Sequence, residues 1–281
     1  MWKSLCLLAA TYKLCKYLSS GREPVKKEKV VIVGASSGIG KELALLYAKR
    51  GCELIIVARR KELLDNLKQH CLAYTRKVEY FTADITMEEQ ISDLANFTKE
   101  YLGNVDLLVI SSGILSVSTF EQLCCNNLSE SATALFHTNV LGPILLSKYF
   151  KPLLIKGKLC VISSLSAYFG APTRSLYSMS KFALRGFFES LRIEWQPLGI
   201  SIILINPATV NTSFRSNSID SSNSNLISKG LDPVKVAAII SKANDSRSRL
   251  VFIPNYYYMT VILGYLLPNL IDYFASKKYK Y

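Results

Sequence analysis

Tyr177 and Lys181 are the residues whose types and spacing most directly suggest chemistry. Residues four apart lie on one face of a helix, so the ammonium of Lys181 would stand beside the phenol of Tyr177. A positive charge there favours the phenolate and lowers a tyrosine pKa that is ordinarily near ~10. A tyrosine adjusted in this way can donate or accept a proton at neutral pH. Ser164, thirteen residues before Tyr177, supplies a hydroxyl that could polarise the same substrate oxygen.

A Tyr-x3-Lys pair alone is more often a surface tyrosine beside a solvated lysine, so its meaning depends on the rest of the chain. The apolar, β-branched run 29–34 predicts a buried strand, and a helix-patterned segment begins at Lys41 and stops at Gly51. Between them lie three glycines in the spacing Gly-x3-Gly-x-Gly. Strand, glycine loop and helix N-terminus predict a dinucleotide site, where unpaired N–H groups receive a pyrophosphate. The residues assigned to it are Gly34, Ser36, Ser37, Gly38, Ile39 and Gly40.

Further strand-like runs alternate with helical stretches along the chain. Six follow the first, at residues 53–58, 77–82, 105–110, 158–163, 200–205 and 250–253. This alternation predicts an α/β fold, a Rossmann-type doubly wound parallel sheet of about seven strands flanked by helices in a single domain. We expect residues 29–255 to form it, after an apolar and basic segment at 1–28 and before an apolar segment at 256–281 with a basic end.

Several separate motifs, in this order, resemble the short-chain dehydrogenase/reductase family over roughly residues 29–253. The matching motifs are Gly34-Ala-Ser-Ser-Gly-Ile-Gly40, Asp84 in Ala-Asp-Ile, Asn139 in Thr-Asn-Val-Leu-Gly, Ser163-Ser164, Tyr177-Ser-Met-Ser-Lys181 and Asn206-Pro207. The resemblance implies cofactor contacts from Asp84, Ser112, Gly113, Asn139, Tyr177, Lys181, Pro207, Val210 and Thr212.

The same resemblance implies a catalytic set of Asn139, Ser164, Tyr177 and Lys181. Tyr177 would be the general acid for ketone reduction or the base for alcohol oxidation, and Ser164 would orient and polarise the carbonyl. Lys181 would hold the pKa of Tyr177 down and contact the nicotinamide ribose. Asn139 would anchor a water that links the lysine to bulk solvent.

The chain departs from the family pattern at two places beside the expected cofactor cleft. The family's Asn-Asn-Ala-Gly is Ile110-Ser-Ser-Gly113 here, so the local hydrogen bonding must differ, and its Pro-Gly is Pro207-Ala208. Both departures allow an unusual cofactor affinity. They keep a non-catalytic NADP(H)-binding sensor or scaffold as an alternative to an enzyme.

The end of the second expected strand indicates which dinucleotide binds. An acid there would accept a hydrogen bond from the ribose 2′-OH of NAD, whereas a basic residue suits the 2′-phosphate of NADP. The chain has Arg59 and Arg60 at this point and no acid before Glu62. We therefore predict NADP(H), with Arg59 as the main phosphate contact and Arg60 or Lys41 as helpers.

Together these patterns predict an NADP(H)-dependent oxidoreductase that interconverts a ketone and a secondary alcohol by hydride transfer. The chain looks most like membrane-associated hydroxysteroid dehydrogenases and 3-ketosphinganine reductase-like members of the family. That resemblance implies a lipophilic substrate, such as a steroid, a retinoid, a keto lipid or a 3-ketosphinganine. A soluble reductase of small carbonyl compounds is the further alternative.

Composition argues against several other kinds of chemistry. The chain has two histidines, His70 and His137, and no Cys-x2-Cys pair among its seven cysteines, so we predict no metal site. The odd cysteine count favours reduced thiols that face the cytosol. A net charge of +13 would suit nucleic acid, but no recognition motif accompanies it, and we predict no nucleic-acid partner.

Both ends of the chain are apolar and predict contact with a membrane surface. Residues 4–12 are too short an apolar run to span a bilayer, and basic residues follow them. Residues 250–271 carry no charge, and Pro254 and Pro268 interrupt them. This tail could be a substrate-pocket lid, a dimer element or a re-entrant membrane helix, and we favour membrane association. We expect the endoplasmic reticulum or another intracellular membrane, with the catalytic domain facing the cytosol, and a homodimer is possible.

Segment 211–225 is polar and low in complexity. It falls where the family carries its mobile substrate loop. We expect it to be disordered or to become ordered when the cofactor binds.

Overall fold

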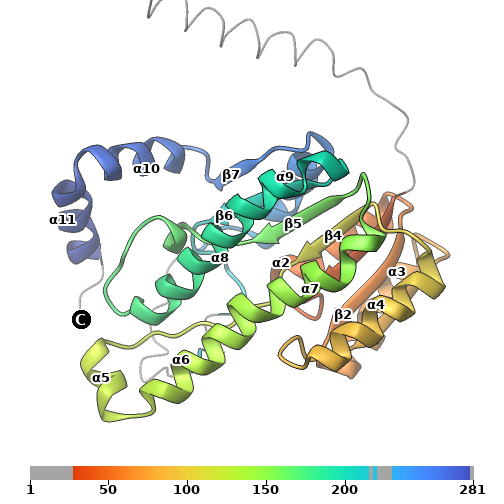
Figure 1. The fold of residues 1–281 in the computed structure, drawn as a ribbon, viewed down its shortest axis with the longest axis horizontal. Helices are drawn as coiled ribbons and strands as arrows, with labels where there is room; N and C mark the ends of the chain where they lie inside the picture. The colour runs from red at the N-terminus through yellow and green to blue at the C-terminus, as the bar shows by residue number, and fades with distance from the viewer. Residues whose placement is uncertain (1–27, 215–217, 220–229, 279–281) are drawn as a thin grey trace, which may run out of the picture.

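The computed structural model describes residues 28–214, 218–219 and 230–278. Its centre is a seven-stranded parallel sheet with the strand order β3-β2-β1-β4-β5-β6-β7 (Figure 1). The strands are β1 (Lys29–Val33), β2 (Glu53–Ala58), β3 (Val78–Thr82), β4 (Leu107–Ile110), β5 (Lys158–Ile162), β6 (Ser201–Pro207) and β7 (Leu250–Ile253). The strand order changes direction between β1 and β4, so the predicted doubly wound parallel sheet is confirmed.

Strand limits differ from the expected ones by a few residues. The limits of β4 and β6 differ most: β4 begins at Leu107 and not at Val105, and β6 ends at Pro207 and not at Ile205. The N–H of Val105 donates to the carbonyl of Leu153, outside the sheet, so this apolar residue belongs to the helix layer. An apolar run alone does not separate a residue buried in a strand from one buried just before it.

Helices cover both faces of the sheet. They are α2 (Gly38–Lys49), α3 (Lys61–Leu72), α4 (Glu88–Leu102), α5 (Phe120–Cys125), α6 (Leu128–Phe136), the π-helical turn η1 (His137–Leu141), α7 (Gly142–Phe150), α8 (Ser175–Glu194), α9 (Pro233–Asp245), α10 (Tyr257–Leu266) and α11 (Pro268–Lys278). Short 3-10 turns are η2 (Lys151–Leu153), η3 (Leu165–Ala167) and η4 (Gln196–Leu198).

Alternate residues of the central strands enter two different cores. In β1, Val30 and Ile32 pack with α2, α3 and α9, while Val31 and Val33 pack with α4, α7 and α8. Because side chains alternate between the two faces and helices cover both, such strands appear in the sequence as continuous apolar runs. The doubly covered sheet makes the carboxyl ends of its strands a rigid platform for the loops that follow.

The chain leaves the sheet at β7 and forms α10 and α11 beyond that edge (Figure 1). The apolar tail therefore becomes two short helices of 10 and 11 residues. Across residues 28–214, 218–219 and 230–278, no helix combines the length and hydropathy needed to cross a membrane. The N-terminal segment that we expected to associate with a membrane lies almost entirely outside the described residues.

Candidate active site

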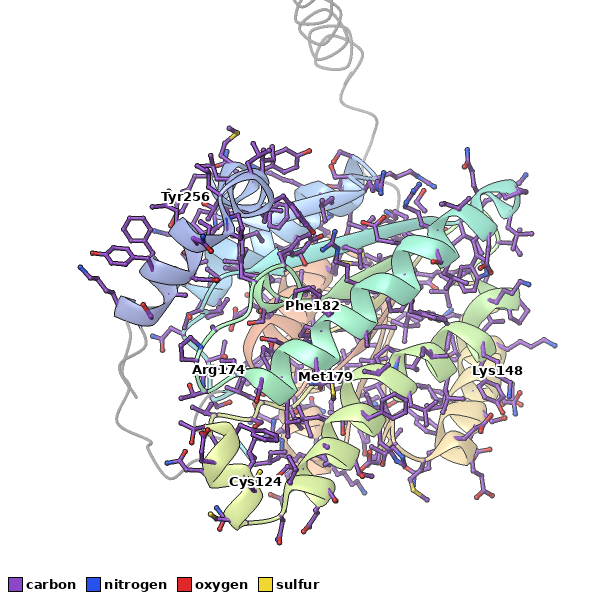
Figure 2. The ribbon with its side chains drawn as sticks, turned by 60° about the vertical axis from the view of Figure 1, so that its left-hand side comes forward. Cys124, Lys148, Arg174, Met179, Phe182 and Tyr256 are labelled. Atoms are coloured by element: carbon purple, nitrogen blue, oxygen red, sulfur yellow. The ribbon has the colours of Figure 1, made fainter. Side chains whose placement is uncertain are left out.

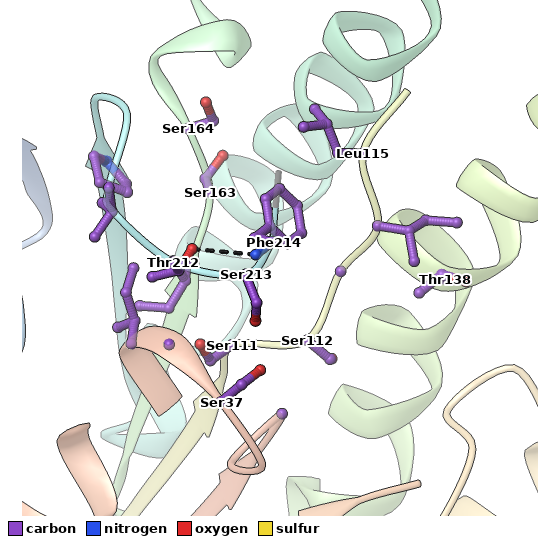
Figure 3. Close-up of a pocket in the computed structure, with 18 of the residues that line it drawn as sticks. Ser37, Ser111, Ser112, Leu115, Thr138, Ser163, Ser164, Thr212, Ser213 and Phe214 are labelled. Atoms are coloured by element: carbon purple, nitrogen blue, oxygen red, sulfur yellow. Dashed lines mark hydrogen bonds between the residues drawn. The ribbon is translucent and has the colours of Figure 1, made fainter. Parts of the chain in front are cut away.

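A cleft of about 570 Å³ opens at the carboxyl ends of the central strands. Ligands of open α/β sheets bind at this edge, beside the point where the strand order changes direction. Figure 3 shows serine, threonine and apolar side chains from several loops around it. Of the predicted site residues, Gly40 and Asn139 lie outside its lining. The predicted residues that line it are Gly34, Ser36, Ser37, Gly38, Ile39, Arg59, Arg60, Asp84, Ser112, Gly113, Ser164, Tyr177, Lys181, Pro207, Val210 and Thr212.

Helix α8 carries Tyr177 and Lys181 into the cleft. Both side chains are buried, whereas Met179 and Phe182 lie on the outer side of the same helix (Figure 2). The Nζ of Lys181 lies 5.7 Å from the centroid of the Tyr177 ring. It also donates to the carbonyl of Ile162 at 3.5 Å. The spacing of four residues therefore places both groups on one face of the helix, as predicted.

Ser164 reaches the same place from the end of β5. It has an extended backbone and caps η3, and its Oγ accepts from the N–H of Ser166 at 3.1 Å. Its hydroxyl also acts to lower the pKa of the Tyr177 phenol. Strand β5 and helix α8 thus bring Ser164, Tyr177 and Lys181 together, although the serine and the tyrosine belong to different elements.

The acid–base properties of the pair differ from the expectation. Burial raises the pKa of Tyr177 to about 12, and the hydrogen bond with Ser164 and the charge of Arg174 oppose this only in part. Burial also lowers the pKa of Lys181 to about 8. The spacing along the helix predicts where the lysine charge lies. It does not predict that both groups lose contact with water, and this loss is the main cause of both pKa shifts. Tyr177 is therefore a protonated phenol at neutral pH.

Asn139 lies behind the cleft, in the π-helical turn η1 between α6 and α7. Its Oδ1 accepts from the N–H of Ile114 at 2.8 Å, and its Nδ2 donates to the carbonyl of Ile114 at 2.9 Å and to Ser180 Oγ at 3.0 Å. The Asn139 amide therefore connects the segment after β4 to helix α8, where Ser180 lies between Tyr177 and Lys181 in the sequence. Turns of this kind are frequent at functional sites. The structure gives Asn139 a positioning role, and its role as a water anchor stays a prediction.

The glycine loop brings backbone very close to backbone. Gly34 has φ +89°, and a Cβ there would lie 2.5 Å from the nitrogen of Ser112. A Cβ on Gly40 would lie 2.2 Å from the carbonyl oxygen of Gly34, so Gly40 is needed for helix packing although it does not line the cleft. Helix α2 begins at Gly38 without an acid in its first turn and without a side-chain bond from its cap residue Ser37. Its N–H groups therefore suit an anion such as a pyrophosphate.

Two arginines stand at the end of β2. Arg60 Nη2 donates to Ser36 Oγ at 2.8 Å and to Ser37 Oγ at 3.0 Å, so this side chain lies across the glycine loop. Arg59 is mostly exposed, with Nη1 3.3 Å from Asp84 Oδ2. The sequence predicted Arg59 as the main contact of the 2′-phosphate and Arg60 as a helper. In the structure, Arg60 is the arginine that hydrogen-bonds the glycine loop. Lys41, the other predicted helper for the phosphate, does not line the cleft.

Asp84 contacts Thr86 on one side and Arg59 on the other. The N–H and the hydroxyl of Thr86 donate to Asp84 Oδ1 at 3.0 and 2.9 Å. Burial acts to raise the pKa of Asp84, but the bonds from Thr86 and the charge of Arg59 lower it overall. Asp84 is therefore a carboxylate at neutral pH.

The departure from the family pattern after β4 preserves the pairing of the sheet at this point. The N–H of Ser111 donates to the carbonyl of Val33 at 2.8 Å. The hydroxyl oxygen of Ser112 is buried and makes no hydrogen bond within the described part of the chain. Gly113 follows, with Lys181 Nζ 3.8 Å from where its Cβ would be.

Among the cleft residues that were absent from the predicted site are Arg174, Phe214 and Tyr257. Arg174 is buried at the start of α8, and its Nη1 donates to the carbonyl and hydroxyl oxygens of Thr173. Its position three residues before Tyr177 could have indicated it. The ring of Phe214 lies 6.3 Å from that of Tyr177. Phe214 lies in the segment expected to be the substrate loop, and Tyr257 lies in the tail for which a substrate-pocket lid was one alternative. No local pattern marks either residue individually.

The expected substrate loop is only partly described. Residues 215–217 and 220–225 lie outside the described residues. The N–H of Phe214 donates to Thr212 Oγ1 at 3.4 Å (Figure 3). The N–H of Ile219 donates to the carbonyl of Leu115 at 2.9 Å, and Ser218 Oγ donates to the same oxygen at 3.0 Å. The described part of this segment therefore meets the wall of the cleft that follows β4. Over residues 28–214, 218–219 and 230–278, no three His, Cys, Asp or Glu side chains are arranged to hold a metal ion.

Comparison with known proteins decides the family. A family model described as short chain dehydrogenase matches residues 28–223. The chain belongs to the short chain dehydrogenase family. The resemblance inferred from the motifs is confirmed, and the family makes the protein an oxidoreductase.

Relatives of this short-chain dehydrogenase match most of its length. Dehydrogenase/reductase SDR family member 7B of Xenopus tropicalis is 29% identical over 285 residues, which cover 96% of this chain and 91% of the relative. The hydroxysteroid 11-beta-dehydrogenase 1-like protein of Gallus gallus is 30% identical over 252 residues, 88% of this chain and 85% of the relative. A short chain dehydrogenase/reductase from Burkholderia phymatum, solved in complex with NAD, has a TM-score of 0.78 at 20% identity and covers 88% of this chain and 96% of its own. That likeness establishes the shared fold.

Proposed function

We propose that this short-chain dehydrogenase interconverts a ketone and a secondary alcohol on a lipophilic substrate, with NADP(H) as its cofactor. The observation that carries the proposal is the convergence of Ser164, Tyr177 and Lys181 in the cleft that also contains the glycine loop. One cleft thus joins a proton donor, a hydroxyl for the substrate oxygen and a cradle for a dinucleotide. Reversible hydride transfer needs these groups held in a fixed geometry.

The electrostatics suit ketone reduction at neutral pH. Because burial raises the pKa of Tyr177 to about 12, its phenol keeps a proton that it can donate to a carbonyl oxygen. The hydroxyl of Ser164 can hydrogen-bond the same oxygen. Lys181, with a pKa of about 8, is mostly cationic at pH 7, and its charge would stabilise the phenolate that forms. When bound, NADPH would supply the hydride in this direction and become NADP+.

The two arginines at the end of β2 support NADP(H) over NAD(H). Arg59 and Arg60 both line the cleft beside the glycine loop, and a guanidinium can bind a phosphate through two parallel hydrogen bonds. Asp84 already accepts hydrogen bonds from Thr86 and faces Arg59. The positive charge at this end of the cleft therefore suits a 2′-phosphate better than a neutral 2′-OH.

Apolar side chains around the catalytic end support a lipophilic substrate. Leu115, Leu165, Phe214 and Tyr257 line the cleft. A relative that spans most of the chain is named as a hydroxysteroid dehydrogenase-like protein. We therefore propose a steroid, a retinoid, a keto lipid or a 3-ketosphinganine-like compound as the substrate class. Two further expectations stay predictions: location at the endoplasmic reticulum or another intracellular membrane, and assembly as a homodimer.

NADPH oxidation by the purified full-length protein tests this function. The panel contains keto steroids, long-chain keto lipids, 3-ketosphinganine and a small water-soluble ketone. We expect turnover of a lipophilic ketone, and Tyr177→Phe should lower kcat/KM by about 100-fold or more while NADPH still binds. Tyr168→Phe is the matched control, because Tyr168 is equally buried, lies outside the cleft and has no hydrogen-bond partner for its hydroxyl within the described residues.

The same assay separates the alternatives. If wild type and Tyr177→Phe were equally inactive on every compound while both bound NADPH, a sensor or scaffold would replace the enzyme. Turnover of the small ketone alone would favour a reductase of small carbonyl compounds.

A further inference from the structure

Arg174 places a buried positive charge beside the catalytic groups. It lines the cleft that contains Ser164, Tyr177 and Lys181, and 6% of the residue is exposed. Figure 2 shows Arg174 where the chain enters α8. Burial removes much of the hydration of a guanidinium, so an arginine is seldom buried unless its charge interacts favourably in the fold. Inside a cleft such a charge acts strongly on neighbouring groups, because water screens it less than at the surface.

The residue before Arg174 has an unusual backbone conformation that helps to fix the arginine. Thr173 has φ +62°, in the left-handed region that a β-branched residue rarely adopts. Its carbonyl oxygen and its Oγ1 both accept hydrogen bonds from Arg174 Nη1, at 3.0 and 2.9 Å. Strained backbone of this kind costs stability and is concentrated at functional sites. The strained turn therefore orients the guanidinium at the start of α8.

Arg174 lies one helical turn before Tyr177. Its carbonyl accepts the N–H of Ser178 at 2.7 Å, so the arginine already takes part in the first turn of α8. Arg174, Tyr177 and Lys181 are spaced by three and then four residues, which places them along one face of the helix. The charge of Arg174 acts to lower the pKa of Tyr177, against the larger effect of burial. The phenol therefore has one cation a turn before it and another a turn after it.

The charges that face Tyr177 come from α8. Strand β5, helix α10 and the segments after β4 and β6 contribute hydroxyl, aromatic and aliphatic side chains to the described lining, including the phenol of Tyr257. The other charged residues of that lining follow β2 and β3, at the cofactor end: Arg59, Arg60 and Asp84. Over the residues that the structure describes, Arg174 and Lys181 are thus the two cations at the catalytic end of the cleft.

These two cations respond differently to pH. Burial lowers the pKa of Lys181 to about 8, so its ammonium loses the proton above that pH. A guanidinium keeps its charge throughout the pH range in which proteins are folded. Above pH 8, Arg174 is therefore the cation of the catalytic end that remains charged.

We propose that Arg174 is a second cation of the catalytic site, which stabilises the negative charge on the oxygen of Tyr177 as this residue gives up its proton. In ketone reduction the carbonyl carbon receives the hydride of NADPH, which becomes NADP+, and the carbonyl oxygen receives the proton of Tyr177. The phenolate that remains is stabilised by Arg174 as well as by Lys181. Arg174 acts through Tyr177 and not on the substrate, and the inference rests on the proposed function.

A direct titration of Tyr177 tests this interaction without turnover. The full-length protein is labelled with 3-fluorotyrosine, and the 19F NMR signal of Tyr177 is the one that Tyr177→Phe lacks. Fluorine lowers the pKa of a phenol and so brings the titration closer to neutral pH. In Arg174→Gln the midpoint should rise by about one pH unit, because a nearby positive charge favours the ionised phenol. Arg174→Lys retains a charge and should shift the midpoint less.

The matched control is Arg192→Gln. Arg192 is also a partly buried arginine of α8, but it lies outside the cleft, with its Nε 3.8 Å from Glu189. This change should leave the midpoint of Tyr177 where it is in the wild type. Urea denaturation of each variant shows that it is folded before it is titrated.

The pH dependence of turnover tests the role in catalysis. Lys181 shares the stabilisation of the phenolate at pH 7 but is mostly neutral at pH 9. Arg174→Gln should therefore lower kcat for ketone reduction about threefold at pH 7 and about tenfold or more at pH 9, relative to the wild type at the same pH. Arg174→Lys should recover part of the loss. A defect of packing alone would lower kcat by the same factor at both pH values.

Two results would overturn the inference. One is a Tyr177 midpoint that Arg174→Gln leaves unchanged. The other is a loss of kcat that is equal at pH 7 and pH 9. A wild type that turns over no ketone would refute the proposed function instead, and the fluorine titration would still decide whether Arg174 acts on Tyr177.

Discussion

Replacing Lys181 with methionine should stabilise the fold while it stops catalysis. The lysine is 3% exposed, and methionine has a similar length without the charge. Burial lowers the pKa of Lys181 from 10.5 to about 8, which means that the folded state disfavours the charged form. At pH 7 the ammonium is nevertheless mostly protonated, so the fold retains a destabilising charge that the proposed chemistry uses.

The size of the effect follows from that shift. One pKa unit corresponds to about 1.4 kcal/mol, so a fall from 10.5 to about 8 corresponds to roughly 3 kcal/mol. The unfolded chain holds this proton more tightly than the folded one. Between pH 8 and 10.5 the stability of the wild type therefore rises with pH. The advantage of Lys181→Met should be about 3 kcal/mol at pH 7 and should disappear as the pH approaches 10.5.

Urea denaturation without added cofactor measures the difference, at pH 7 and again well above pH 8. Lys158→Met is the matched control, because Lys158 is also buried but forms an ion pair with Glu28. Removing Lys158 leaves a mostly buried carboxylate unpaired and should cost about 3–5 kcal/mol. NADPH oxidation by Lys181→Met should meanwhile fall about 100-fold or more.

Two outcomes would refute this reasoning. One is a Lys181→Met variant that is less stable than the wild type at pH 7. The other is a stability difference that does not shrink as the pH rises. Either result would mean that the cleft compensates the buried ammonium and that its desolvation does not dominate.

The remaining predictions concern the cofactor end of the cleft and the packing behind it. Arg59→Ala and Arg60→Ala should each raise the Kd for NADPH about tenfold or more and leave the Kd for NADH nearly unchanged, as measured by calorimetry. Equal losses for both cofactors would contradict the phosphate contact. Asn139→Ala should lower the free energy of unfolding by about 1–3 kcal/mol, because the N–H and carbonyl of Ile114 lose their partner, and a urea titration that shows no change would contradict this. Gly40→Ala should lower the free energy of unfolding by about 1–3 kcal/mol in the same assay, because its Cβ would clash with the glycine loop. Gly186→Ala on α8 is the control: a Cβ there meets nothing within 4 Å, so the change should be neutral or stabilising. Equal effects of the two changes would contradict the packing argument.

Much of the cleft was predictable because parallel strands end at one edge. The glycine loop follows β1, Arg59 follows β2, Asp84 follows β3 and Ser164 follows β5, so the order of the motifs along the chain already implied that they meet. The contact between Tyr177 and Lys181 was predictable for a simpler reason, since both are on one helix. Local periodicity indicated the strands and helices, and the resemblance to the family indicated which residues at their ends belong to the site.

Other properties required distances between segments that are far apart in the chain. The resemblance to the family named Asn139 as a site residue, but the π-helical turn that carries it and its bonds to Ile114 depend on how α6 and α7 pack against the segment after β4. The two arginines could be counted, but which of them lies on the glycine loop depends on how α3 leaves β2. Tyr257 reaches the cleft because α10 folds back onto η3 and α8.

The sequence by itself determined the doubly wound α/β fold and the residues that meet at its carboxyl edge, because continuous apolar runs and strand-loop-helix order are local properties of the chain. The tertiary structure decided how those residues behave. Burial raised the pKa of Tyr177, against the expectation that the neighbouring ammonium would lower it, and burial also lowered the pKa of Lys181. It also decided that the uncharged helix α10 remains at the surface beside the cleft. Both results follow from which groups lose contact with water on folding, and this depends on the packing of segments that no local pattern joins.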